Sequence, residues 1–370
     1  MIDATYDEIC GLGNSSDVVA RMAAGRPSFS LQIVLTLLLV PTIALGILGN
    51  LVVCLIVYRK PAMRSAINLL LATLAFADLL LCVTCAILDL ISLVAAAWLF
   101  GALTCRISAA LFALFAIEAV TILLIISIDR FLIIARRQDR LTPRKAKVII
   151  VASWAAALAL ALPAVLGWPG IEVPPRAPQC VLAPAASFLG QSYAGLVATA
   201  VFFAPFAAML YAYLGIFNTV RRNAVRVHDH PAGLCLSQAG KLSLTGLQTL
   251  ARLNAEVSFK TRAFATVLLL FAVYVLCFMP YAIFSLMAAF NLTFYCGSNF
   301  YVTSAWVLWL AYLKSALNPI IYYWRIGKFR HACDELVPSF LCAIPVNLWP
   351  GCARVRPSTV YVCTDNHSAL

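Results

Sequence analysis

The sequence predicts an all-α membrane protein, a seven-transmembrane helix bundle with a short membrane-surface helix after the seventh span. Three observations lead to this prediction. Hydrophobic residues make up 63% of the chain and charged residues 11%, whereas soluble domains carry about 25% charged residues. The apolar residues form seven stretches, each of roughly the 20 residues that cross a bilayer as a helix. Basic residues gather after the odd-numbered stretches, as expected if those segments face the cytoplasm.

The seven spans are expected at residues 31–58, 66–94, 104–135, 146–167, 190–220, 262–290 and 300–323. Each is rich in Leu, Ile, Val, Ala and Phe. Within lipid the backbone must satisfy its own hydrogen bonds, so these spans are helices. Pro205, Pro280 and Pro319 each remove one helical hydrogen bond and permit a kink in spans five, six and seven. We expect an N-terminal tail (1–30), the bundle (31–323), an amphipathic helix 8 (324–335) and a C-terminal tail (336–370).

The basic residues predict the orientation. They follow span one at Arg59, Lys60 and Arg64, and they are also dense after spans three and five. We therefore expect a multi-pass protein of the plasma membrane with an extracellular N-terminus and a cytoplasmic C-terminus. The first thirty residues lack the apolar core of a cleavable signal peptide, so the first span is expected to direct targeting. The net charge of +12 reflects topology and attraction to acidic lipid. No nucleic-acid motif, catalytic site, cofactor site or metal site is expected.

The thirteen cysteines are interpreted by the side of the membrane on which they lie. Cys105 opens span three and Cys180 lies in the second outer loop, so both are in the oxidising compartment and we expect them to form a disulfide. A second bridge between Cys10 and Cys296 is left open. Cysteines on the inner side near basic residues are candidate palmitoylation sites: Cys333, Cys342 and Cys352. Asn14 and Asn291 begin glycosylation sequons.

Motifs in all seven spans resemble the rhodopsin-like G-protein-coupled receptors. The resemblance covers residues 31–335 and depends on Gly49-Asn50, Leu74 to Leu79, Trp98 with Phe100-Gly101, Asp129-Arg130, Trp154, Pro205, Tyr213, Pro280, Asn318-Pro319 with Tyr322, and Phe329. Within the family, residues 61–68, 129–134 and 357–363 are similar to a small group of orphan receptors. The resemblance implies a receptor and not an enzyme, with a heterotrimeric G protein and arrestin as partners.

The resemblance also assigns an activation switch. Arg130 pairs with Asp129 at rest and moves toward Tyr213 and Tyr322 on activation, which makes a two-state element. The expected switch residues are Asp129, Arg130, Tyr213, Lys260, Tyr274, Phe278, Pro280, Asn318, Pro319 and Tyr322.

Three of these switch residues depart from the family's pattern. Phe278 replaces a tryptophan, Tyr274 replaces a phenylalanine, and Lys260 replaces an acid that clamps Arg130 in many relatives. Since the resting state loses that attraction, we expect appreciable ligand-independent activity.

Three ionisable residues lie deep in the spans, where charge is costly enough to suggest a function: Asp78, Glu118 and Lys314. In the family the position of Asp78 helps bind sodium, together with a hydroxyl residue that is Ala119 here. Lys314 lies about one helical turn from Asn318, so we expect its ammonium to pair with Asp78. Glu118 is left either to pair with Lys314 or to stay protonated. The alternative is that each charge meets only water or backbone carbonyls.

A ligand pocket is expected between spans two, three, five, six and seven. Asp89 lies eleven residues beyond Asp78, on a similar face of span two, and is the acid expected to line it. Aromatic walls are expected from Phe112, Tyr281, Trp309 and Tyr312. Phe112 stands where amine receptors carry an aspartate, so an amine is disfavoured. A lysophospholipid is less favoured than another apolar molecule, because Arg106 at the rim is the available cation.

Two other functions are possible for a chain with several membrane helices. A retinal-binding photoreceptor is the alternative within the fold, but opsins place their lysine at the position of Tyr312, and Lys314 is rotated from it by about 200°. A membrane transporter or channel is the alternative from another class; its paired broken helices and internal repeats are not found in this sequence. Ser368-Ala369-Leu370 fits the C-terminal motif that PDZ domains bind.

Overall fold

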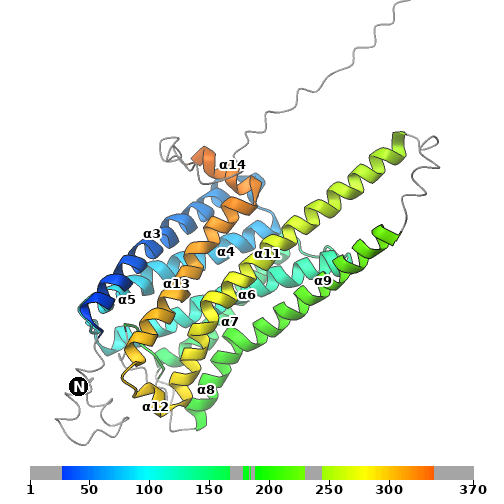
Figure 1. Cartoon of the computed structure of the whole chain (residues 1–370). Helices are drawn as coiled ribbons and strands as arrows, with labels where there is room; N and C mark the ends of the chain where they lie inside the picture. The colour runs from blue at the N-terminus through cyan, green and yellow to red at the C-terminus, as the bar shows by residue number, and fades with distance from the viewer. Residues whose placement is uncertain (1–26, 167–177, 183, 185–187, 230–243, 337–370) are drawn as a thin grey trace, which may run out of the picture.

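A computed structural model describes residues 27–166, 178–182, 184, 188–229 and 244–336, and of 223–229, 244–263 and 336 the backbone only. Seven membrane-length helical segments lie side by side (Figure 1). The segments are α3 (Phe29–Arg59), α4 (Ala66–Leu81) continued by η2 (Cys82–Ala86) and α5 (Ile87–Ala95), α6 (Gly101–Arg136), α7 (Pro143–Leu166), α8 (Phe188–Ala198) continued by η3 (Thr199–Phe203) and α9 (Ala204–Asp229), α11 (Leu244–Phe290), and α13 (Phe300–Arg325).

Short elements complete the described chain. A 3-10 helix, η1 (Pro61–Met63), follows α3, α12 (Leu292–Tyr295) precedes α13, and α14 (Gly327–Leu336) follows it. Packing runs around the bundle, because α3 contacts α4 and α13, α6 contacts α4, α7 and α9, and α11 contacts α13. This arrangement confirms the seven-helix fold class.

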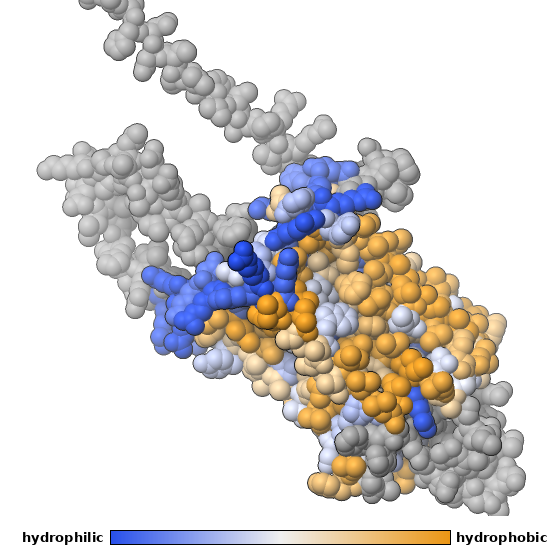
Figure 2. All heavy atoms as spheres, turned by 180° about the vertical axis from the view of Figure 1, so that it is seen from behind, coloured by the Kyte–Doolittle hydropathy of each residue, from blue (hydrophilic) through white to orange (hydrophobic). Residues whose placement is uncertain are grey.

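The lipid-facing surface agrees with a transmembrane bundle. Six of the segments combine membrane-spanning length with high hydropathy. The seventh, α13, has 26 residues, about 39 Å of helix, and its inward-facing Lys314 and Asn318 lower its hydropathy. In Figure 2 apolar side chains cover much of the visible face, while hydrophilic side chains gather toward one end of the bundle.

Local signals explain several helix ends. Ser28 and Ser65 cap α3 and α4, where each hydroxyl accepts a hydrogen bond from a backbone N–H three residues on, at 3.3 and 3.4 Å. Ala96 and Arg137 end α5 and α6 in the left-handed conformation, with φ of 52° and 55°. Such a residue terminates a helix because the next N–H turns back to an earlier carbonyl.

Two π-helical turns interrupt spans two and five, and the sequence did not predict them. The turn η3 lies just before Pro205, and the N–H of Ala204 donates to the carbonyl of Thr199, five residues back. Proline has no N–H to donate to the carbonyl of Val201, four residues before it. The hydroxyl of Tyr274 from α11 donates to that carbonyl at 2.7 Å. A side chain of span six thus satisfies a backbone group that span five leaves open.

The ends of the bundle are fastened by specific contacts. Cys105 at the start of α6 and Cys180 are joined by a disulfide with a Cα–Cα distance of 5.5 Å, which confirms the expected bridge. At the other end, α14 lies across the bundle (Figure 1) and Phe329 packs on Tyr322 with ring centroids 6.1 Å apart. Lys60 forms an ion pair with Glu335 of α14. The hydrogen bond from Lys60 holds the pKa of the Glu335 carboxyl below its ordinary value of 4.5.

Candidate functional site

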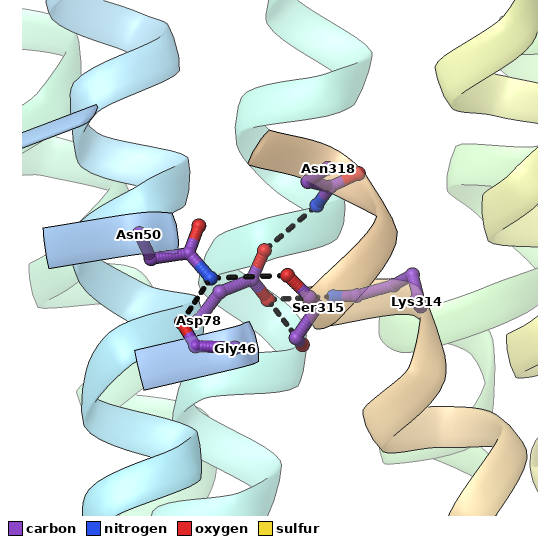
Figure 3. Close-up of polar contacts among 6 residues, drawn as sticks. All are labelled: Gly46, Asn50, Asp78, Lys314, Ser315 and Asn318. Carbon is purple, nitrogen blue, oxygen red and sulfur yellow. Dashed lines mark hydrogen bonds and ion pairs between the residues drawn. The ribbon is translucent and has the colours of Figure 1, made fainter. Parts of the chain in front are cut away.

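The centre of the bundle holds a buried charge network around Asp78 (Figure 3). The Lys314 ammonium lies 3.0 Å from Asp78 Oδ1, and the two side chains are 4% and 1% exposed. Ser315 donates to the same carboxylate oxygen at 2.7 Å, while Asn318 donates to Oδ2 at 2.7 Å. Both oxygens of Asp78 therefore have partners from α13, and the expected internal pair is present.

Asn50 joins α3 to the same network. Its side-chain amide donates to the carbonyl of Gly46 at 2.7 Å and to the carbonyl of Ser315 at 3.0 Å. Three helices thus meet through polar groups that lipid could not solvate. Ala119, which stands where relatives carry a hydroxyl, is buried and has no side-chain oxygen.

Of the two alternatives left open for Glu118, the pair with Lys314 is not the contact that the structure shows. Glu118 is buried on the side of α6 that contacts α7, where the hydroxyl of Ser153 donates to Oε1 at 2.9 Å. Among the described residues Oε2 has no hydrogen-bond partner. The reason is rotational: the helix turns about 100° per residue, so a side chain directed at α7 cannot also reach the network at α13.

The switch residues lie in the arrangement that the resemblance assigns to the resting state. Arg130 contacts the carboxylate of Asp129 through Nη2 at 2.5 Å and through Nε at 3.0 Å. The hydroxyl of Tyr213 lies 2.8 Å from that of Ser127 and 3.1 Å from the carbonyl of Val267. Tyr322 is buried against Phe329. Arg130, Tyr213 and Tyr322 are thus not brought together here.

An aromatic column rises through α11 from the switch toward the opposite end. Tyr274 stacks on Phe278 at 5.7 Å between centroids, Phe278 contacts Tyr281 at 5.5 Å, and Tyr281 contacts Phe112 of α6 at 4.8 Å. Pro280 lies inside the same helix. A displacement of Phe112 would therefore be transmitted through a continuous series of ring contacts to Tyr274, whose hydroxyl is hydrogen-bonded to η3.

A cavity of about 140 Å³ opens beside this column. Its walls come from α6, α7, α8, η3, α11 and the chain at 180–182, and they include Phe112, Phe278 and Tyr281. Among the described residues, the walls carry no Lys, Arg, Asp or Glu, and their polar side-chain groups are the hydroxyls of Tyr193, Tyr281 and Ser285.

Three residues expected in the pocket lie elsewhere. Asp89 is buried and accepts a hydrogen bond from the hydroxyl of Tyr312. Trp309 donates to Thr42 of α3 at 3.3 Å. The π-helical turn η2 lies between Asp78 and Asp89, so the two residues do not share the helix face on which the spacing placed them. One extra residue in a turn rotates the rest of the helix by about 100°. The cavity thus involves spans three to six and not spans two and seven.

Several expected positions lie outside the described residues: Cys10, Asn14, Cys342, Cys352 and Ser368 to Leu370. The side chain of Lys260 also lies outside them. Cys296 is disulfide-bonded. Asn291 is exposed and caps α12, where its Oδ1 accepts from the N–H of Phe294 at 2.9 Å. Cys333 is half-buried against the apolar core.

Sequence reasoning missed several polar partners within the bundle: Asn50, Ser127, Ser153 and Ser315. Each is a small polar residue in an apolar span, which is the signal that could have indicated them, since polar groups in a membrane are buried and paired. Ser315 follows Lys314 directly and could have been read as part of the same site.

Comparison with known proteins identifies the family. A sequence profile described as "7 transmembrane receptor (rhodopsin family)" matches residues 49–322. The chain belongs to this family. It is 51% identical over 98% of its length to the high-affinity lysophosphatidic acid receptor of Xenopus laevis, covering 97% of that protein. It is also 50% identical to the probable G-protein coupled receptor 45 of Homo sapiens, over 96% of this chain and 95% of that one.

A third relative and a solved structure agree with this assignment. The probable G-protein coupled receptor 63 of Mus musculus is 49% identical over 96% of this chain and 84% of its own length. The crystal structure of squid rhodopsin matches the fold with a TM-score of 0.70 at 20% identity, covering 85% of this chain and 88% of that one.

Membership of the rhodopsin family fixes the coarse function. The chain is a multi-pass receptor of the plasma membrane that acts through heterotrimeric G proteins, and it is not an enzyme. The two alternatives, a photoreceptor and a transporter, are not favoured. The ion pair between the Lys314 ammonium and Asp78 also disfavours a photoreceptor, because this ammonium is bound within the bundle and is not free to form a Schiff base.

Proposed function

We propose that this receptor activates G proteins without added ligand and that its outer cavity takes an apolar molecule without net charge. The observation that carries the ligand class is the cavity wall, which presents three side-chain hydroxyls but no ionic group among its described residues. A charged ligand would lose its hydration there without gaining a partner of opposite charge. The volume of about 140 Å³ is below the roughly 300 Å³ of ordinary drug sites, so a slender chain fits best.

Ligand-independent signalling is supported by the switch residues. Lys260 stands where many relatives carry an acid that holds Arg130. The contact to Arg130 among the described side chains is its neighbour Asp129. A resting state with one ion pair in place of two is separated from the active state by a smaller free energy, so a larger active fraction is expected.

The test of basal activity is G-protein dissociation in cells without ligand, normalised to surface expression. Lys260→Glu restores the acid and should lower the basal signal several-fold. Lys147→Glu is the matched control, because it makes the same charge change at an exposed position of α7 and should leave the signal unchanged. A Lys260→Glu baseline equal to or above that of the wild type would refute the proposal.

A lysophospholipid is the second candidate, because a relative with 51% identity is named as a lysophosphatidic acid receptor. Its phosphate would need a cation, and exposed Arg106, next to bridged Cys105, is available on α6. The acyl chain would then occupy the apolar cavity.

Two ligands separate the candidates. Lysophosphatidic acid and an uncharged monoacylglycerol with the same chain are compared on wild type and on Arg106→Gln. A neutral-ligand site predicts a monoacylglycerol response that Arg106→Gln leaves intact. A response to lysophosphatidic acid alone, lost in Arg106→Gln, would favour the phospholipid.

We further propose the finer topology and partners. The N-terminus is extracellular and the C-terminus cytoplasmic, which the distribution of basic residues supports. Arrestin is a second partner, and a PDZ domain is a third through Ser368-Ala369-Leu370. Antibody access to terminal tags in intact and permeabilised cells tests the topology.

A further inference from the structure

An apolar groove of about 310 Å³ lies between α3, α13 and α14, away from the cavity described above. Side chains from all three helices line it: Leu48, Val52, Ile320, Tyr323, Phe329 and Cys333. None of the described residues that line it is charged. The groove is therefore suited to an apolar occupant.

The walls of the groove face the bilayer. Leu48 is 62% exposed and Ile320 is 40% exposed in the isolated chain, and both belong to membrane-length helices. The surroundings of such side chains are lipid acyl chains and not water. An empty groove of this size would forfeit dispersion contacts along its whole wall, so a chain from the bilayer is the fitting occupant.

Exposed basic residues adjoin the lining residues in the sequence. Arg59 follows the lining residue Ile56 by three positions, Arg325 follows Tyr323 by two, and Lys328 directly precedes Phe329. The two acids of α14 already have partners within the protein: Asp334 accepts a hydrogen bond from the hydroxyl of Tyr323 at 3.2 Å, and Glu335 forms an ion pair with Lys60. The remaining positive charge complements an anionic headgroup. Basic clusters beside membrane helices bind acidic lipids in this way.

We propose that this groove binds one acyl chain of an anionic phospholipid of the inner leaflet, whose headgroup is held by Arg325 and Lys328. The inner leaflet follows from the topology proposed above. The acyl chain packs along α3 and α13 and against Phe329 and Cys333 of α14.

The groove adjoins one of the switch residues. Tyr322 lines it and packs on Phe329 with ring centroids 6.1 Å apart.

Lipid binding can be measured on the purified full-length receptor by native mass spectrometry. Phosphatidylserine and phosphatidylcholine with identical chains are titrated in turn. Wild type should retain phosphatidylserine at lower concentration. Arg325→Gln with Lys328→Gln should weaken that binding roughly 30-fold, since each basic residue near the surface contributes about a factor of five in affinity. Phosphatidylcholine binding should be unchanged by this pair of substitutions.

Filling the groove tests the chain site. Leu48→Trp should reduce retention of both lipids, while Leu158→Trp, at a position of α7 that is also exposed, should reduce neither. A photoreactive acyl chain of phosphatidylserine should label peptides within 48–56 or 319–333. The thermal midpoint of each variant, measured without lipid, shows that it is folded.

Three results would overturn the proposal. Equal retention of the two lipids by wild type would exclude headgroup selection. Unchanged retention in Leu48→Trp would exclude the groove. A hydroxylamine-sensitive acyl group on Cys333 that persists after delipidation would mean that a covalent chain occupies the site. None of these readouts depends on G-protein activation, so they separate this proposal from the proposed function.

Discussion

Removing the charge of Lys314 should destabilise the receptor far more than removing a surface charge. In Lys314→Met the carboxylate of Asp78 stays buried but loses the ammonium at 3.0 Å. Breaking a buried pair in this way typically costs about 3 to 5 kcal/mol. Asp78 keeps the hydrogen bonds from Ser315 and Asn318, each at 2.7 Å, so we expect the lower end, about 3 kcal/mol.

The assay is thermal unfolding of the purified receptor. At roughly 2 °C per kcal/mol for larger proteins, Lys314→Met should lower the midpoint by about 6 °C. Lys147→Met, at an exposed position of α7, should change the free energy of unfolding by less than about 0.5 kcal/mol. Adding Asp78→Asn to Lys314→Met removes the orphaned charge and should recover more than half of the loss.

Two results would refute this reasoning. One is a double variant no more stable than Lys314→Met, which would mean that the two residues do not act as a pair. The other is a wild-type midpoint that rises with sodium but not with potassium or choline at equal ionic strength. We expect no such rise, because Lys314 already neutralises Asp78 and Ala119 offers no side-chain oxygen.

Three further predictions concern contacts between elements. Cys180→Ser should leave the Cys105 thiol without its disulfide, reduce surface delivery and lower the free energy of unfolding by roughly 2 to 5 kcal/mol. Peptide mapping without reduction should find the bridge only in wild type. Tyr274→Phe removes the hydrogen bond from the hydroxyl in span six to the carbonyl of Val201 in span five at 2.7 Å, so it should lower stability by about 1 to 3 kcal/mol. Since this bond joins the two spans while Arg130 is paired with Asp129, its loss should raise basal signalling, and lower signalling would contradict this reasoning. Because pairing with Lys60 depresses the Glu335 pKa below 4.5, the stability that this ion pair contributes is complete above the ordinary pKa and is lost as pH falls through the depressed one. The protection factors of the α14 amides, which correct for the intrinsic pH dependence of exchange, should therefore be constant from pH 7 to 5 and fall at lower pH, whereas those of Glu335→Gln should not show this fall.

The apolar stretches of the sequence were sufficient to place the helices, although Lys314 and Asn318 lower the hydropathy of the seventh. Span seven was expected at 300–323 and is observed at Phe300–Arg325, because lipid requires a continuous hydrogen-bonded helix wherever the chain crosses it. The Asp78–Lys314 pair was also predictable, since two opposite charges in the same apolar bundle gain most by meeting. The first result follows from the pattern of apolar residues along the chain, and the second from the helical spacing of Lys314 and Asn318 together with the family position of Asp78.

Rotational detail was not predictable from spacing. The counting that placed Asp89 above Asp78 assumed an unbroken α-helix, but the π-helical turn η2 lies between them. Whether a helix accommodates an extra residue depends on contacts with its neighbours, which one sequence does not display. The partner of Glu118 was left open for a similar reason, because the direction of its side chain toward α7 or α13 depends on the packing of whole helices.

The close approach of α3 to α13 has a consequence for observing the receptor at work. A Cβ atom at Gly49 would lie 2.8 Å from the Cβ of Pro319, a distance that real Cβ atoms do not adopt, so the backbone of the first span packs directly on Pro319 of the seventh. Contact of this kind has no flexible side chain to absorb displacement. A fluorophore or spin label on the lipid-facing side of α3 should therefore report rearrangements of the Asn318-Pro319 segment, although α3 itself carries none of the switch residues.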